Sequence, residues 1–450
     1  MATENKMGVM PLNRLLISMS VPMMISMLVQ ALYNIVDSIF VSRIDENALT
    51  AVSLAFPLQT LMIALGTGTG VGINALLSKS LGEKDFDKAD KTAENGVFLA
   101  LINYVVFCLI GFFLTKPFYL SQTRDPQIIE YGVQYLRIVC CCSFGMYAQF
   151  VFERLLQSTG KTVYTMITQS LGAVINIVLD PIFIFGLHMG VRGAALATVI
   201  SQCCSCIWVI SFLFGRRTTL RIRGKNMGLK AAYILPCLAL GSAIFIMQGS
   251  ESIISVCFNS SLLKYGGDIA VGAMTILTSV MQFAMLPLQG LGQGAQPIIS
   301  YNYGAKNASR VRSAFKLLLK VSLLYSTILW LFIMCFPKVF ASIFTTDAAL
   351  IAFTKDALRY YLAALFMFGI QIACQMTFNA LGNAPASILV AIMRKFVLLL
   401  PLIFILPHII TADKTMAVYL AEPIADVLAV TFTSILFSFQ FKKAIREMEK

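Results

Sequence analysis

Charged side chains are scarce in this chain. Asp, Glu, Lys and Arg together make up 13% of its 450 residues, against roughly a quarter in an average soluble domain. Hydrophobic residues make up 58%, and long apolar stretches such as 97–114 and 317–336 recur between short polar connections. A helix that crosses a bilayer needs about 20 mostly apolar residues. The composition therefore excludes an ordinary soluble domain and predicts an all-α polytopic membrane protein with twelve transmembrane helices, six in each half.

Histidine and the common catalytic motifs are also lacking. The chain has two histidines, His188 and His408, and neither lies in the middle of an apolar segment. The sequence contains no His-Glu-x-x-His motif and no arrangement of a serine with a histidine partner. The glycine-rich stretch 66–72 lacks a following Gly-Lys-Ser/Thr, so it indicates close helix packing rather than a phosphate-binding loop. These absences argue against an enzyme.

The eleven cysteines all lie in apolar segments. Cys140, Cys141 and Cys142 are consecutive, and consecutive residues on a helix point about 100° apart, so the three cannot converge on one ion. We expect small, buried, reduced side chains and no metal cluster.

The chain is one unit written twice. At a spacing of 222 residues, four glycines, a lysine and an aspartate recur: Gly68, Gly70, Gly72, Gly82, Lys84 and Asp125 match Gly290, Gly292, Gly294, Gly304, Lys306 and Asp347. Six membrane crossings return each repeat to the side of the membrane on which it began. The two repeats must therefore be parallel, and we expect substrate to pass through the cleft between them. The sequence predicts an N-lobe at 1–215, a basic cytoplasmic linker at 216–230 and a C-lobe at 231–450.

A net charge of +13 would suit a nucleic-acid partner, but its distribution does not. Most of the 35 Lys and Arg residues fall in alternate connections, including the run 216–230. This is the positive-inside bias of membrane proteins, and it predicts that both termini are cytoplasmic and that the basic connections face lipid headgroups. We therefore expect membrane lipids as partners and no nucleic acid.

Ionisable residues inside the membrane are costly and usually functional. In the first half, Asp37 lies in the first segment, Asn176 and Asp180 lie four residues apart in the fifth, and Thr198 lies in the sixth. Their oxygens suit a proton, or Na⁺ if all four converge. Two simpler roles compete with this one, since Asp180 precedes the helix break at Pro181 and Asp37 has Asn34 nearby.

In the second half, Glu251 and Asp426 are the candidates to line a cavity and exchange protons. Glu422 precedes Pro423 and is equally compatible with a position near the membrane interface. Arg394 and Lys395 are expected toward the inner face. Candidate cleft residues, any of which generic packing would explain equally well, are Gln30, Tyr33, Asn34, Met146, Gln149, Gln282 and Gln371.

With these features in hand, the chain closely resembles the MATE family of multidrug and toxin extrusion antiporters, most of all its bacterial MepA-like branch. The resemblance covers roughly residues 12–440 and rests on four stretches together: 33–41, 66–82, 176–183 and 287–297. It implies two V-shaped six-helix lobes and export of cationic, amphipathic drugs in exchange for H⁺ or Na⁺.

The resemblance also implies roles for individual residues. Asp37, Asn176, Asp180 and Thr198 match the family's cation or proton site in the N-lobe, and Pro22 matches a proline at which the first helix bends. Glu251 matches an acid implicated in coupling. Some members carry an acid in the tenth segment, but 366–374 has none here, only Gln371. Coupling through the N-lobe is therefore favoured.

The predicted function is alternating-access export, with binding of the coupling ion at Asp37 and Asp180 expelling a cationic drug. No cofactor is expected beyond the coupling ion, H⁺ or Na⁺. The expected setting is the bacterial cytoplasmic membrane, as a monomer. The alternative is a flippase for lipid-linked saccharide precursors, which would need cationic side chains in the cleft to hold a pyrophosphate.

Overall fold

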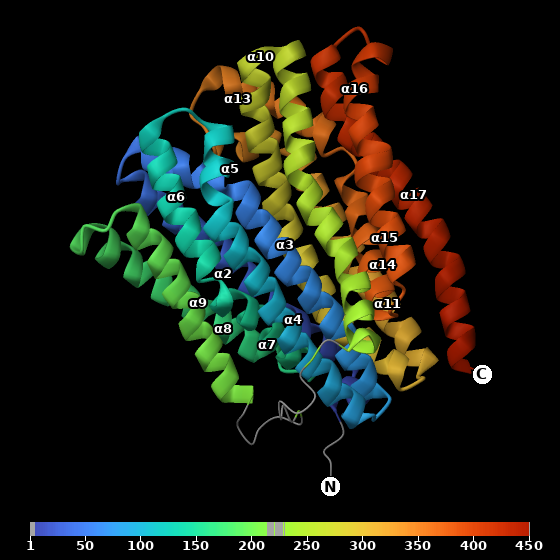
Figure 1. Ribbon diagram of the computed structural model, residues 1–450. Coiled ribbons are helices and arrows are strands. Elements are labelled where there is room, and N and C mark those ends of the chain that lie inside the picture. The colour runs from blue at the N-terminus through green and yellow to red at the C-terminus, as the bar shows by residue number, and fades with distance from the viewer. Residues whose placement is uncertain (1–4, 214–219, 221–227, 229, 450) are drawn as a thin grey trace.

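The computed structural model describes residues 5–213, 220, 228 and 230–449. Within these ranges the ordered elements are all helices (Figure 1). Nine helices of the described chain are long and apolar enough to cross a membrane, or up to eleven if each of two bent helix pairs counts as one span. One of the nine, α10 (Ala231–Gly304), consists of two antiparallel legs joined at Gly267, where φ is 67°. The predicted all-α polytopic fold is confirmed.

The first half of the described chain (residues 5–213) forms six long segments and two short helices. They are α1 (Lys6–Val9), α2 (Leu12–Ser42), α3 (Glu46–Gly82), α4 (Phe86–Phe113), α5 (Thr115–Gln122), the bent pair α6 (Pro126–Cys141) and α7 (Phe144–Ser158), α8 (Thr162–Pro181) continued by η1 (Ile182–Gly186), and α9 (Val191–Leu213). The predicted linker 216–230, apart from Leu220, Gly228 and Lys230, lies outside the described residues.

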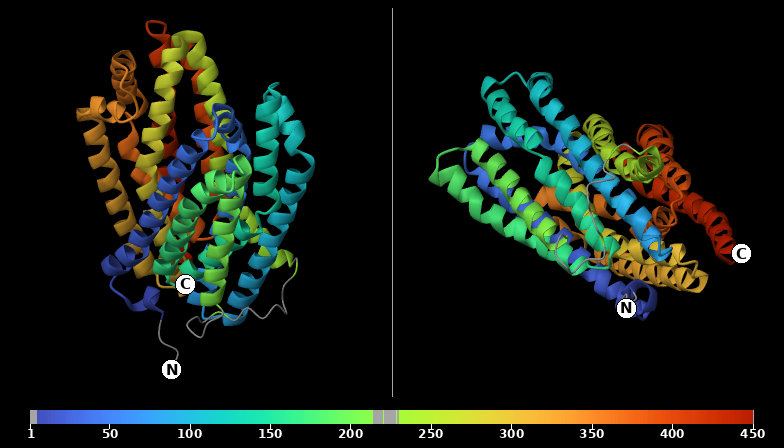
Figure 2. Two further views of the ribbon diagram at one scale, coloured as in Figure 1. Left: turned by 90° about the vertical axis from the view of Figure 1, so that its left-hand side faces the viewer. Right: turned by 60° about the horizontal axis from the view of Figure 1, so that its bottom comes forward.

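The second half (residues 230–449) repeats this plan. After the two legs of α10 come α11 (Ala308–Cys335), α12 (Pro337–Ser342), the bent pair α13 (Ala348–Tyr361) and η2–α14 (Leu365–Ala380), the run α15–η3–α16 (Ala384–Ile409), and α17 (Lys414–Glu449). Seen with the bottom of Figure 1 turned forward, the second-half helices, yellow to red, lie on one side and most first-half helices on the other (Figure 2).

The repeat extends to the backbone at helix starts. Lys84 and Lys306, 222 residues apart, both have positive φ (59° and 53°). The residue after each caps the next helix, because Asp85 accepts a hydrogen bond from the Lys88 amide and Asn307 accepts one from the Arg310 amide. A short side-chain acceptor at this position satisfies one of the free amides of the helix start. Both halves therefore use the same device to turn the chain between corresponding helices.

The two halves meet at the end of the molecule that carries α1 and the last turn of α17, here called the terminal end (Figure 1). A Cβ on Gly82 of α3 would overlap the Tyr301 carbonyl oxygen of α10, and a Cβ on Gly304 would overlap the Lys79 carbonyl oxygen. Gly82 with Gly304, and Lys79 with Tyr301, are repeat-related pairs, so one contact is made twice. The expectation that these glycines permit close helix packing is confirmed.

The same exchange continues deeper between the helices. Gly68 of α3 packs on Gly241 in the first leg of α10, where an added Cβ would lie 2.6 Å from a carbonyl oxygen. Gly290 of the second leg packs on Met24 of α2, with an added Cβ 2.7 Å from the backbone. In the first half, α3 packs on the first leg of α10. In the second half, the second leg of α10 packs on α2, so the glycine-bearing helix of each half contacts the first long helix of the other.

The start of the chain also bridges the halves at the terminal end. Met7 of α1 is fully buried, and its carbonyl oxygen accepts hydrogen bonds from Asn302 Nδ2 (3.0 Å) and Arg310 Nη2 (3.0 Å) of the second half. Lys6 lies against Gly160 of the first half, whose added Cβ would be 2.9 Å from Lys6 Cε. The terminal end is therefore closed by contacts from both halves.

Candidate functional site

Two acids lie together in the part of the first half remote from the terminal end. Asp37 is in the last two turns of α2 and Asp180 is the second-last residue of α8, and these two helices pack against each other. Asp180 is fully buried and Asp37 is half-buried. Their side chains interact directly with each other.

Asn176 and Thr198 complete the group. Asn176 lies one turn before Asp180 on α8, and its Nδ2 is 3.5 Å from Asp180 Oδ1 and 3.4 Å from Thr198 Oγ1 of α9. The Thr198 hydroxyl donates to the Ala194 carbonyl oxygen (3.1 Å). The structure therefore brings together all four residues singled out in the sequence.

Three oxygens of this group accept no hydrogen bond although they are buried: Asp37 Oδ1, Asn176 Oδ1 and Asp180 Oδ2. Buried polar atoms are normally paired, because an unpaired one costs several kcal/mol at worst. Oxygens with free lone pairs in a fixed cluster fit a bound hard cation such as Na⁺, or a proton held between the two carboxylates. The simpler role for Asp37, pairing with Asn34, has no support in the structure, since Asn34 is exposed and only its carbonyl oxygen is bonded, to Ser38.

Pro22 lies within a continuous α2. A proline inside a helix removes the hydrogen bond to the carbonyl four residues earlier, here that of Ser18. The Thr162 hydroxyl at the start of α8 donates to this freed carbonyl (3.1 Å), and Ser26 Oγ donates to the Pro22 carbonyl (2.8 Å). A weak point in α2 is thus held by the same helix that carries Asp180.

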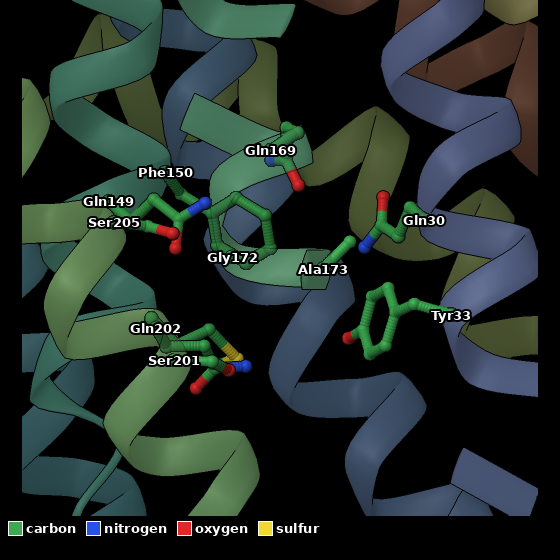
Figure 3. Close-up of a pocket in the computed structure, with 11 residues that line it drawn as sticks. Gln30, Tyr33, Gln149, Phe150, Gln169, Gly172, Ala173, Ser201, Gln202 and Ser205 are labelled. Atoms are coloured by element: carbon green, nitrogen blue, oxygen red, sulfur yellow. The ribbon is translucent and has the colours of Figure 1, made fainter. Parts of the chain in front are cut away.

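A polar cavity of about 40 Å³ lies among α2, α7, α8 and α9 (Figure 3). Four of the seven predicted cleft residues line it: Gln30, Tyr33, Met146 and Gln149. The side chains of Gln30 and Tyr33 point into it from α2, opposite Gln149, Ser201 and Gln202 (Figure 3). Tyr33 lies four residues before Asp37 on α2, so the two side chains share a helix face.

The other three predicted cleft residues lie elsewhere. Asn34 and Gln282 are exposed and do not line this cavity. Gln371 of α14 is buried, with neither amide atom bonded. A cavity of this size holds one or a few water molecules and no drug.

The acids of the second half are paired with cations. Arg394 donates from Nε to Asp426 (2.9 Å) and from Nη2 to Glu422 (3.1 Å), and its guanidinium lies 4.7 Å from the centroid of the Phe368 ring. Lys395 Nζ lies 2.5 Å from Glu251 Oε1. Arg394, Glu422 and Asp426 are all at most 6% exposed, whereas the Glu251 side chain is 58% exposed.

Two expectations from the sequence are corrected by these contacts. Arg394 and Lys395 were expected toward the inner face, but they lie in η3, in the middle of the run 384–409, and both are buried. Glu422 was equally compatible with a position near the membrane interface. In the structure it is buried and ion-paired with Arg394. Each cation is held in the span by an acid from another helix, which lowers the cost of burying it.

Comparison with known proteins identifies the chain. The sequence profile of the MatE family matches residues 22–182 and 243–405, one stretch in each half. The chain belongs to the MATE family. A multidrug export protein MepA of Staphylococcus haemolyticus is 26% identical over 86% of this chain and 85% of its own length.

Solved MATE structures share the fold over the whole chain. A MATE protein in the bent conformation superposes with a TM-score of 0.94 at 25% identity, covering all of both chains. A multidrug resistance MATE transporter in an outward-facing conformation gives a TM-score of 0.92 at 26% identity, over 99% of this chain and all of the other. The chain is therefore a multi-pass MATE transporter and not an enzyme.

Sequence analysis missed two buried acids of this MATE protein, Glu94 of α4 and Glu153 of α7. Glu153 of α7 is 4% exposed and accepts hydrogen bonds from Gln149 (2.8 Å) and Gln169 (2.9 Å and 3.1 Å). Its neighbour Arg154 also lies within α7, which continues to Ser158. The signal available was Gln149, which is four residues before Glu153 and so on the same helix face.

Proposed function

We propose that this MATE transporter is a secondary antiporter that exports cationic, amphipathic compounds in exchange for H⁺ or Na⁺. The observation that carries the proposal is the set of three buried oxygens without hydrogen-bond donors on Asp37, Asn176 and Asp180. A group of this kind gains stability from a cation or proton and loses it when the ion leaves. The MepA relatives, named multidrug export proteins, support the choice of substrate class.

The orientation follows from charge. The basic stretches 79–91 and 306–320 lie at the terminal end (Figure 1), so the positive-inside rule assigns that end to the cytoplasm and the site of Asp37 to the outer part of the span. The glycine contacts then hold the two halves together on the cytoplasmic side. We infer a bacterial cytoplasmic membrane location, with one chain supplying the whole pathway.

The proposed exchange uses one two-state equilibrium for both ligands. An ion arriving from outside binds Asp37 and Asp180 and neutralises them, which weakens their attraction for a cationic compound. The same event favours bending of α2 at Pro22, because Thr162 of the helix carrying Asp180 holds the freed carbonyl there. Release of the ion to the cytoplasm restores the negative charge for the next compound.

We place coupling in the first half. Asp426 already has Arg394 as a counter-ion, and Glu251 has Lys395. An acid that is neutralised within the protein has less to gain from an incoming ion. Glu251 remains the better second-half candidate, since its side chain is mostly exposed.

The flippase alternative is not favoured. It requires cationic side chains free to hold a pyrophosphate, and Arg394 and Lys395, the cations in mid-span, are both ion-paired.

The test is ethidium transport by the purified protein in proteoliposomes, with an imposed pH gradient and an imposed Na⁺ gradient applied separately. Transport driven by one gradient is expected to fall about a hundredfold in Asp37→Asn. It should be unchanged in Asp356→Asn, an exposed acid of α13. Transport that survives Asp37→Asn at the wild-type rate would overturn the assignment.

A further inference from the structure

A coupling ion bound at Asp37 and Asp180 still has to reach the terminal end. Part of this distance is spanned by one face of α8, on which Asp180, Asn176, Ala173 and Gln169 are spaced three or four residues apart. From Asp180 to Gln169 the helix advances about 16 Å. Gly172, Ala173 and Gln169 line the polar cavity, and Gln169 is the residue that donates to Glu153 (Figure 3).

Glu153 lies at the inner end of this path. Both glutamines that hold its carboxylate, Gln149 and Gln169, line the cavity. The cavity also reaches Gln30 and Tyr33, and Tyr33 lies four residues before Asp37 on the same face of α2. Its volume of about 40 Å³ admits one or a few waters with several polar partners. The cavity therefore lies between the outer acid pair and Glu153 along α8.

The surroundings of Glu153 leave its charge uncompensated by direct contact. Among the described residues no cation lies within ion-pair distance of it. Arg154 is its neighbour in the chain and interacts at longer range, but Arg154 Nη1 donates to Gln157 and to Gln293 of α10 (both 2.8 Å). The remaining titratable group that faces it is Cys206 of α9. A buried carboxylate held only by neutral amides gains from taking up a proton.

The partners of Glu153 argue against bound Na⁺. Gln149 and Gln169 present N–H groups to both carboxylate oxygens. Na⁺ would need oxygen lone pairs in their place, which is the arrangement at Asp37, Asn176 and Asp180. The two sites of the first half therefore differ in kind.

We propose that Glu153 is the inner proton acceptor of the transport cycle, between the Asp37/Asp180 pair and the cytoplasm. This rests on the proposed antiport and selects its proton-coupled form. The protonated aspartic acid passes its proton through water in the cavity to the Glu153 carboxylate, leaving an aspartate and a glutamic acid. Glu153 then gives the proton to cytoplasmic water when the halves separate at the terminal end. That separation also breaks the hydrogen bond from Arg154 to Gln293.

The test compares Glu153→Gln and Glu153→Asp with Glu94→Gln, an equally buried acid of α4 outside the cavity. Three quantities are measured in proteoliposomes: ethidium binding, release of bound ethidium on acidifying the outside, and steady-state export driven by a pH gradient. For Glu153→Gln we expect normal binding and acid-triggered release, because both depend on Asp37. Steady-state export should fall about a hundredfold. Glu153→Asp should restore part of it, and Glu94→Gln should export like the wild type.

Infrared difference spectroscopy supplies a second readout. Between high and low pH, the protein should show a protonated-carboxyl band that is lost in Glu153→Gln and shifted in Glu153→Asp. Steady-state export at the wild-type rate in Glu153→Gln would overturn the inner acceptor, as would an unchanged carboxyl band in both variants. If either result were accompanied by loss of acid-triggered release in Asp37→Asn, the inner acceptor would be wrong. The proposed antiport through Asp37 would still be supported.

Discussion

In the first half, Asp37 and Asp180 lie together with carboxylate oxygens that accept no hydrogen bond, whereas in the second half Arg394 lies between Glu422 and Asp426 and donates to both. The two halves share a helix plan and a glycine contact, so the fold does not dictate this difference. One copy keeps its acids available and the other neutralises them. This difference agrees with the proposed division, in which the first half binds the coupling ion and ion pairs stabilise the second half.

The largest expected effect comes from removing Arg394, the cation that pairs with the buried acids of the second half. Arg394→Met leaves Glu422 and Asp426 buried without a counter-ion, and we expect the free energy of unfolding to fall by about 3–5 kcal/mol. The measurement is thermal and denaturant unfolding in detergent. Arg359→Met, an exposed arginine of α13, is the matched control. Equal stability of the two variants would show that the pairing does not hold the second half together.

The first half should respond in the opposite way. Asp180→Asn removes a buried charge that has no cationic partner, so unfolding should be unchanged or shifted to higher temperature. Gradient-driven ethidium export should nevertheless fall about a hundredfold, because the coupling site is lost. Both properties are measured on one preparation. A variant that lost stability as well as transport would show that Asp180 mainly supports the helix before Pro181, and the contrast between the halves would disappear.

The smallest effect tests what the halves share. Gly82→Ala and Gly304→Ala each force a methyl group against a backbone carbonyl of the other half, so each should lower the free energy of unfolding by about 1–3 kcal/mol, and by similar amounts. Gly272→Ala is the control, since the nearest atom to its added Cβ is a side-chain carbon at 3.7 Å. Strongly unequal effects of Gly82→Ala and Gly304→Ala would mean that the repeated contact has also diverged.

Much of the fold and part of the site could be predicted from the sequence. The repeat, the helix segments and the glycine contacts follow from patterns visible along the chain, and Asn176 and Asp180 share a helix face because they are four residues apart. Asp37 and Thr198 were singled out as polar residues within apolar segments, and the resemblance assigned all four residues to one site. The role of these residues stays a prediction.

The ion pairs of the second half could not be predicted in the same way. Lys395 and Glu251 are 144 residues apart, and Arg394 and Asp426 are 32 apart. No periodicity connects them, because the contact depends on how helices from different parts of the chain pack. An Arg-Lys pair in an apolar run is more common near a membrane interface, where its charge stays hydrated, and this general preference led to the wrong placement.

The glycine contact between Gly82 and Tyr301, repeated between Gly304 and Lys79, has a further consequence. It has the form of an isologous dimer interface, in which one patch meets a copy of itself across a twofold axis. In a homodimer every substitution appears on both sides of the axis at once. Fusion of the two copies in one chain removed that restriction, so one copy carries Arg394 and Lys395 while the positions 222 residues earlier in the other hold Gly172 and Ala173.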